Sequence, residues 1–160
     1  MDEATDPAFA SFYRGHHPRL VTIALGLTGD AEMARDLVQE GFLRAYAHWA
    51  YVAGLELPEA WVRRVVVNLC IDVSRRRMRD RRWVEGVGRP EVIEAERPES
   101  AEVWVLVRAL PARQRSAVAL RYLGDLSVRD VAETLGVTEG TVKVSLHRAH
   151  AALARRLGRS

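Results

Sequence analysis

The sequence predicts an all-helical protein with two small helical domains joined by a flexible acidic linker. Apolar residues recur at spacings of three and four along most of the 160 residues, whereas the alternation typical of strands is scarce. Glycine and proline fall between these periodic segments, where they end helices. Residues 83–99 combine five glutamates with two glycines and two prolines, which indicates the linker. The expected domains are therefore residues 1–82 and 100–160.

In the first half, a helix is predicted from Pro7 to about Thr28, with Pro18 as a candidate interruption because proline disfavours helix in the residue before it. Gly29 is expected to end this first helix, and Asp30 is expected to cap the N-terminus of the next one. The apolar stripe of this second helix must pack inward. Its opposite face places a leucine among charged and polar side chains: Asp36, Gln39, Glu40, Leu43 and Arg44. This face fits a docking surface, although a single exposed leucine needs no function.

Residues 50–57 are expected to form a loop, and Pro58 then opens a third helix at a position that tolerates its missing N–H. The predicted buried stripe of this helix is Trp61, Val62, Val65, Leu69 and Val73. Polar residues recur on another side: Arg64, Asn68, Asp72, Arg75, Arg76 and Arg79. Asn and Asp are poor helix-interior residues unless they have partners. Asp72 therefore either bonds locally to Arg75 or Arg76, or this side binds another molecule.

Charge is distributed unevenly along the chain, whose net charge is only +3. Residues 63–82 hold eight arginines and two aspartates, and residues 138–157 hold four basic residues and one glutamate. Two basic segments separated by an acidic one favour a polyanionic partner that is touched at two places. Solvated helix faces are the alternative explanation.

The second half predicts a helix-turn-helix. A helix begins at Leu110-Pro111, and Ser127 with Asp130 fits a capping box for a short helix after it. Gly136 suits the left-handed end of that short helix, and Thr138 caps the next one. The second helix of such a motif places its N-terminal residues against base edges in the major groove. The candidate DNA-reading residues are Thr138, Glu139, Thr141, Lys143, Val144, His147 and Arg148.

Other classes of protein are excluded by composition. Hydrophobic residues make up 48% and charged residues 28% of the chain, as in folded globular proteins. No apolar run approaches the ~20 residues of a membrane span, and the acidic start is unlike a secretory signal. The one cysteine, Cys70, excludes an internal disulfide and a cysteine-rich zinc site. Because no nucleophile motif, phosphate loop or metal-spaced cluster is present, we expect a cytoplasmic protein with no enzymatic activity, cofactor, metal or membrane contact.

Three segments resemble a known family. Residues 36–45 (DLVQEGFLRA) resemble the signature of bacterial RNA polymerase sigma factors of the extracytoplasmic-function (ECF) type. Residues 126–143 (LSVRDVAETLGVTEGTVK), followed by residues 146–149 (LHRA), resemble the helix-turn-helix of the σ4 domain in that family. The helix with Asn68, Asp72 and Arg75 fits the family's σ2 domain. The resemblance covers about residues 8–82 and 100–157, and the three motifs stand in the family's order and spacing.

The resemblance implies a role for each surface. The face around Leu43 is similar to the surface that docks on the β′ clamp helices of core RNA polymerase, and the β flap is a further expected contact. The segment 47–58 and the polar side of the following helix look like the reader of the −10 element, where an unstacked base is captured. The outward residues from Lys143 to Arg148 match the reader of the −35 element. An anti-sigma factor is a further partner that the family suggests.

This sequence departs from the family pattern at three places. Val144-Ser145 stands where many relatives have Ser-Arg, and Gly41 replaces a larger apolar residue. The segment 47–51 is not a familiar loop sequence, so the −10 preference stays open. A rival hypothesis is an ordinary helix-turn-helix regulator that dimerises on a palindrome. That hypothesis leaves the arginine-rich helix without a role.

Overall fold

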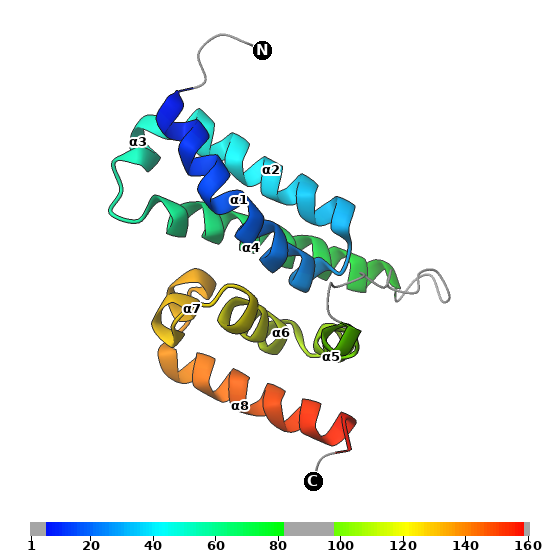
Figure 1. The fold of residues 1–160 in the computed structure, drawn as a ribbon. Helices are drawn as coiled ribbons and strands as arrows, with labels where there is room; N and C mark the ends of the chain where they lie inside the picture. The colour runs from blue at the N-terminus through cyan, green and yellow to red at the C-terminus, as the bar shows by residue number, and fades with distance from the viewer. Residues whose placement is uncertain (1–5, 82–97, 159–160) are drawn as a thin grey trace.

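The computed structural model describes residues 6–81 and 98–158. The first range forms α1 (Pro7–Thr28), α2 (Ala31–Ala47), α3 (Trp49–Ala53) and α4 (Pro58–Arg81). The second forms α5 (Pro98–Arg108), α6 (Ala112–Val118), the π-helical turn η1 (Ala119–Leu123), α7 (Val128–Leu135) and α8 (Glu139–Arg156). The two ranges hold no strand, so the predicted all-helical class is confirmed. In Figure 1, helices α1 to α4 lie above helices α5 to α8.

The predicted helix ends are confirmed by their hydrogen bonds. Asp30 caps α2 by accepting the Met33 N–H at 3.0 Å, and Ser127 caps α7 by accepting the Asp130 N–H at 3.1 Å. Gly29 and Gly136 end α1 and α7 in the left-handed region, with φ of 71° and 67°. L side chains rarely adopt such angles, so glycine relieves strain at both turns.

Three sequence-based expectations need correction. α1 runs through Pro18 without a break. A short helix, α3, takes in the first four residues of the segment expected to be a loop. α5 begins at Pro98 and so takes in the last two residues of the predicted linker. The remaining linker residues up to 97, and Arg82 of the first predicted domain, lie outside the described residues.

The buried side of α4 also differs from the predicted stripe. Val62 is buried as expected, but the other fully buried residues are Val66, Val67 and Cys70. The rest of the predicted stripe is only half-buried: Trp61, Val65, Leu69 and Val73. The run of three valines at 65–67 points to several sides of the helix at once. The pattern alone therefore could not identify which side packs against α1 and α2.

The hydrophobic core is continuous between the two halves of the chain. Phe9, Ile23 and Phe42 from the first half share one cluster with Leu120 and Val131 from the second. The contacts between the halves run from α1 to α5 and η1, and from α4 to α7. A second, smaller cluster lies between α5, α6 and α8: Val107, Leu110, Val118, Ala149 and Leu153.

Two glycines allow helices to approach closely. A Cβ at Gly41 of α2 would lie 2.5 Å from Val66 Cγ2 of α4, so no side chain fits there without movement. A Cβ at Gly26 of α1 would collide with Leu123 Cδ1 at the end of η1. The first close contact lies inside the first half of the chain. The second joins the two halves.

Candidate protein and nucleic-acid interfaces

The outer face of α2 is free and polar around one leucine. All five predicted docking residues are exposed: Asp36, Gln39, Glu40, Leu43 and Arg44. Leu43 is 55% exposed, while Val38 and Phe42 on the opposite side are buried. Arg44 Nε lies 3.1 Å from Glu40 Oε1, which orders the rim of the face. An apolar centre with a charged rim is the anatomy of a protein-docking surface.

The outer side of α4 carries a row of basic and polar side chains. All six predicted residues are exposed: Arg64, Asn68, Asp72, Arg75, Arg76 and Arg79. They lie on the side of the helix opposite the buried Val66 and Cys70, as helical spacing requires. In the described part of the chain, no ion pair joins Asp72 to Arg75 or Arg76. The local-bond explanation for Asp72 therefore gains no support, and the row is open to a partner.

Two other arginines of α4 point inward and have structural partners. Arg77 Nη2 lies 3.0 Å from Asp30 Oδ2, which ties the end of α4 to the cap of α2. The backbone N–H of Met33 and the Arg77 guanidinium both hold the pKa of Asp30 below its ordinary value. Arg63 Nε donates to Thr134 Oγ1 of α7 at 3.2 Å, and burial lowers the pKa of Arg63. The sequence did not distinguish these two arginines from the exposed ones.

The segment before α4 contains two aromatic residues in different surroundings: Trp49 packs against other side chains, and Tyr51 is exposed. Trp49 Nε1 donates to Asp6 Oδ2 at 3.1 Å, and its ring packs against Phe9 and Phe12 with centroids 5.2 Å apart in both pairs. Tyr51 on α3 is 64% exposed. An exposed aromatic ring is a platform on which an unpaired base can stack. Sequence analysis did not single out Tyr51, because residues 50–57 are mostly apolar and an aromatic residue does not stand out among them.

The helix-turn-helix has the geometry that its sequence predicts. Thr138 caps α8 through the Thr141 N–H at 3.1 Å, and the hydroxyls of these two threonines lie 2.9 Å apart. Val142 and Ser145 of α8 are buried. Five candidate reading residues besides the cap are exposed on α8: Glu139, Lys143, Val144, His147 and Arg148. Thr138 is also exposed, and Thr141 is half-buried.

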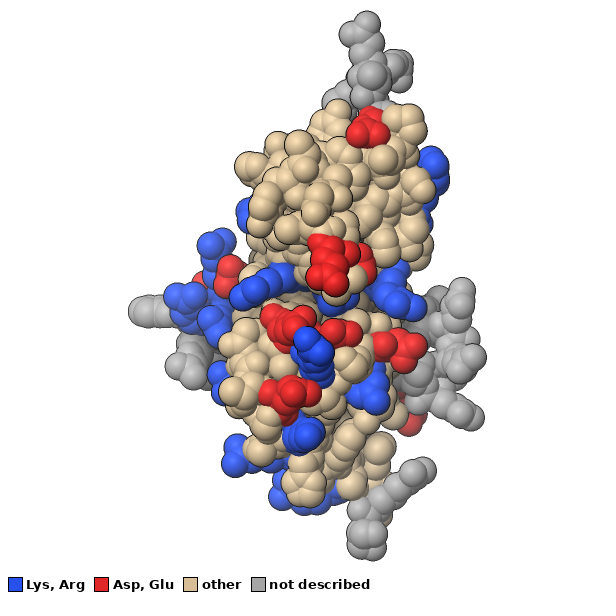
Figure 2. Space-filling model, turned by 90° about the vertical axis from the view of Figure 1, so that its left-hand side faces the viewer, with Lys and Arg blue, Asp and Glu red and all other residues tan. Residues whose placement is uncertain are grey.

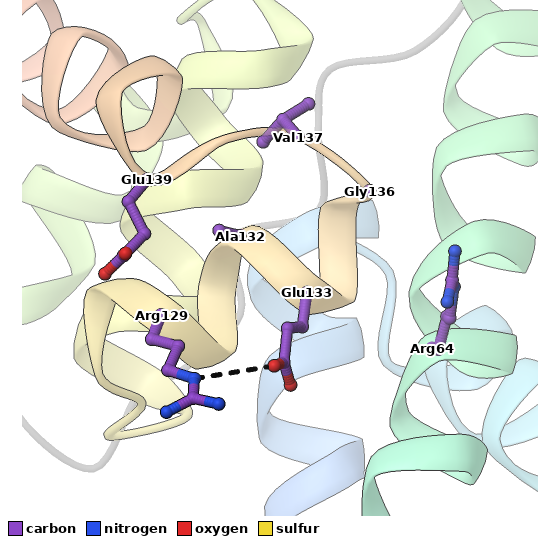
Figure 3. Close-up of a pocket in the computed structure, with 7 residues that line it drawn as sticks. All are labelled: Arg64, Arg129, Ala132, Glu133, Gly136, Val137 and Glu139. Carbon is purple, nitrogen blue, oxygen red and sulfur yellow. Dashed lines mark ion pairs between the residues drawn. The ribbon is translucent and has the colours of Figure 1, made fainter.

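A pocket of about 570 Å³ lies where α4 faces the helix-turn-helix. Its lining includes Arg64 of α4, Glu133 of α7, Gly136 of the turn and Glu139 at the start of α8. Figure 3 shows Arg64 on one side of this space, with Glu133 and Glu139 on elements across from it. Arg129 Nε pairs with Glu133 Oε1 at 3.6 Å along α7. Candidate readers of two DNA elements thus line a single pocket.

Other kinds of site find little support in the described ranges. Residues 6–81 and 98–158 contain no group of three or more His, Cys, Asp or Glu side chains that could hold a metal ion. None of the helices in these ranges is long and apolar enough to cross a membrane.

Comparison with known proteins identifies the family. The model of sigma-70 region 2 matches residues 12–83, and that of sigma-70, region 4 matches residues 100–153. The RNA polymerase sigma-E factor of Streptomyces avermitilis is 31% identical over 147 residues, covering 91% of this chain and 82% of the relative. The chain belongs to the sigma-70 family. As a member, it directs promoter-specific initiation of transcription.

Further comparisons identify the subgroup and the fold of this sigma factor. The ECF RNA polymerase sigma factor SigM of Mycobacterium tuberculosis is 35% identical over 159 residues, which cover 94% of this chain and 78% of SigM. This sigma factor is of the ECF type. The solved sigma factor RpoE of Bartonella quintana, in complex with the anti-sigma factor NepR, superposes with a TM-score of 0.79 at 25% identity. The superposition covers 96% of this chain and 98% of the other.

Proposed function

We propose that this sigma factor uses three separate faces for three contacts during initiation. The outer face of α2 around Leu43 docks on the β′ clamp helices of core RNA polymerase. The outer side of α4 reads the −10 element, and α8 reads the −35 element. In this proposal residues 1–82 form the σ2 domain, residues 83–99 the linker and residues 100–160 the σ4 domain, which also touches the β flap.

The observation that carries the proposal is the division of arginines on α4. Arg63 donates a hydrogen bond to Thr134, and Arg77 forms an ion pair with Asp30. The six candidate residues, in contrast, all lie on the exposed side of the helix. Within residues 6–81 and 98–158, no ion pair engages this basic row, which suits it to phosphates, and phosphate contacts supply much of the affinity for nucleic acid. Structural and DNA-binding arginines thus occupy different sides of one helix.

Tyr51 extends the −10 surface beyond α4. A base that leaves the duplex loses stacking and pairing worth a few kcal/mol, and a protein ring offsets this loss by stacking on it. Tyr51 is an exposed aromatic on α3, a helix that contacts α4. We infer that it stacks on the displaced base, while Trp49 holds the segment in place.

An anti-sigma factor is a further proposed partner. The solved RpoE of Bartonella quintana, which shares the fold over nearly the whole chain, is bound to the anti-sigma factor NepR. An inhibitor of this kind would cover the polymerase-docking face or the DNA-reading faces. Its place of action would be the cytoplasm, where RNA polymerase works, and no catalysis by this chain is involved.

The test is transcription in a purified system. This sigma factor is mixed with bacterial core RNA polymerase and fragments of genomic DNA, and the 5′ ends of the transcripts are sequenced. The expected result is a set of discrete start sites that share paired −35 and −10 elements. Absence of starts, together with binding of a palindromic DNA by the protein alone, would instead identify an ordinary helix-turn-helix regulator.

A further inference from the structure

The outward face of α8 has an apolar residue at its centre. Within α8, every residue of which is described, Val144 is the only large hydrophobic side chain that is exposed, at 50%. Val142, Ser145 and Ala149 are buried on the other side of the helix, which packs against α5, α6 and α7. In Figure 1, α8 lies beyond these helices from α1 and α4. The face that carries Val144 is therefore open to a partner.

A glycine lies one helical turn before Val144. Among the described residues, a Cβ at Gly140 would have one neighbour within 4 Å, Thr138 Oγ1 at 3.8 Å, so the helix surface is bare there. Helical side chains lean toward the N-terminus, so the methyl groups of Val144 lie over the turn that contains Gly140. Glycine lowers helix stability, and close approach of the backbone to a ligand is one use that offsets this loss. A partner can thus reach the backbone at Gly140 and meet the apolar atoms of Val144.

Basic side chains flank this apolar centre. At about 100° per residue, Lys143 and Arg148 fall on opposite sides of Val144, and both are exposed. Figure 2 shows the side of the molecule on which α8 begins: acidic and basic side chains alternate across its middle, and basic ones lie along its lower edge, at the height of α8. A helix in the major groove meets base edges along its middle and phosphates along its flanks. This distribution of charge fits a DNA duplex as the occupant.

The group that an exposed valine can recognise on a base is a methyl group. Val144 has neither a donor nor an acceptor in its side chain, so it forms no hydrogen bond to a base edge. Thymine alone presents a C5 methyl group in the major groove, and apolar contact with that group distinguishes it from the other bases. Valine also has one strongly preferred χ1 rotamer in a helix, so the contact costs little side-chain freedom.

We propose that Val144 is a specificity-determining residue, which packs on the methyl group of one thymine in the −35 element, and that Gly140 permits the close approach this contact requires. The inference rests on the proposed reading of the −35 element by α8. Lys143 and Arg148 hold polar groups on either side of the contact. At this one position, the base is selected by the burial of apolar surface and not by a hydrogen bond.

Replacement of thymine by deoxyuridine tests the proposal, because it removes the methyl group and keeps every hydrogen-bonding group of the base. Each thymine of the −35 element, on both strands of a promoter fragment from the transcription experiment, is replaced in turn. Binding of the complete holoenzyme to each fragment is then measured. We expect one replacement to weaken binding about fourfold, which is the effect of one buried methyl group.

Val144→Ala identifies the side chain that makes the contact. Alanine favours helix and Val144 is exposed, so the fold should persist. The deoxyuridine that weakens binding of wild type should change binding of this variant by less than about twofold, because the apolar partner is gone. Val105→Ala on α5, at a valine that is 41% exposed, is the matched control and should keep the fourfold effect.

Three outcomes of this comparison would overturn the proposal. They are a −35 element without A·T pairs, wild-type binding that is indifferent to every deoxyuridine, and a methyl effect that persists in Val144→Ala. Replacement of the complete −35 element separates this inference from the proposed function. If holoenzyme binding does not change, α8 does not read the element and both fail. If binding is lost while every deoxyuridine is tolerated, only the methyl contact fails.

Gly140→Ala tests the close approach. The added Cβ occupies open space in the free protein, so helix content and stability should not fall. On DNA the same methyl group would stand between the helix and the base edge, and holoenzyme binding should weaken severalfold. Gly15→Ala on α1 is the matched control, since a Cβ there has no neighbour within 4 Å among the described residues, and it should bind as wild type does. Unchanged binding by Gly140→Ala would refute the close approach.

Discussion

Asp30 in the turn between α1 and α2 pairs with Arg77 near the end of α4, with 3.0 Å between Oδ2 and Nη2. The same aspartate caps α2 through its other oxygen, Oδ1, which accepts the Met33 N–H. One side chain thereby fixes the start of the proposed docking helix relative to the proposed −10 helix. Both proposed contacts of the first domain depend on this geometry.

Asp30→Asn should lower stability in a pH-dependent way. Asparagine is also a good N-cap, so the substitution mainly removes the charge. The loss should be about 1 kcal/mol or less at neutral pH, because both side chains are partly exposed. The pKa of Asp30 is lowered in the fold, so its stabilisation is present above the ordinary value of 3.8 and lost as pH falls through the folded pKa. Urea unfolding of both proteins at pH 7 and near pH 3 should show the difference shrinking in acid.

Arg77→Ala and Arg79→Ala should change different properties: the first should lower stability, and the second should weaken promoter binding. Arg77 bonds to Asp30, so its loss should lower the free energy of unfolding by about 1 kcal/mol. Arg79 is exposed on the proposed DNA-binding side, so its loss should leave stability unchanged and weaken promoter binding with a smaller salt dependence. Urea unfolding and filter binding of the polymerase complex at several salt concentrations measure the two effects. Identical behaviour of the two variants would contradict the division of arginines.

Gly41→Ala should destabilise the protein although alanine favours helix. The new Cβ would lie 2.5 Å from Val66 Cγ2, and overpacking of this kind costs about 1–3 kcal/mol against a helix gain of about 1 kcal/mol. Val66→Ala should relieve the collision. The double variant should therefore be more stable than the sum of the two single changes predicts, as a double-mutant cycle by thermal unfolding would reveal. Simple additivity would show that α2 and α4 do not meet at these residues.

Leu43→Ala should weaken binding to core polymerase without unfolding the protein. Leu43 is 55% exposed at the centre of the α2 face, so it adds little to the fold, while a few residues near the centre of an interface carry most of the affinity. Leu57→Ala is the matched control, since Leu57 is 52% exposed on a different segment. Competition between labelled wild type and each variant for core polymerase gives the affinities. Equal competition by the two variants would rule out the α2 face as the docking surface.

Arg148→Ala should affect recognition of the −35 element. If the guanidinium reads a base, the loss should be about 1–3 kcal/mol and confined to one base position, whereas a phosphate contact would weaken all sequences about equally. Arg155→Ala, in the last turn of the same helix, is the control because it lies far from the N-terminal reading residues. Binding of the holoenzyme to −35 variants measures both. Unchanged binding by Arg148→Ala would exclude this residue from the interface.

The sequence predicts local features of this fold better than its packing. Caps at Asp30, Ser127 and Thr138 were predictable because each depends on a few neighbouring residues. The buried side of α4 was not, because three successive valines fit more than one orientation. The close approach of Gly26 to η1 depends on residues almost a hundred positions away, and no local pattern reveals it.

In the candidate sites too, features that depend on local sequence are predictable and those that depend on tertiary packing are not. Exposure of all residues on the α2 and α4 faces follows from helical period once the opposite side is buried. The inward roles of Arg63 and Arg77 require knowledge of Thr134 and Asp30 as neighbours, which only the tertiary structure supplies. A run of arginines looks uniform in sequence because charge is visible there and orientation is not.

The burial of Cys70 has a consequence for signalling. It is the chain's only thiol, it has no exposed surface, and burial raises its pKa to about 12. At neutral pH the thiol therefore stays protonated, whereas the thiolate is the form that oxidants and electrophiles attack. Cys70 is thereby shielded in the folded chain from oxidants that react with exposed thiolates, and oxidation of this thiol requires the core around α4 to open first.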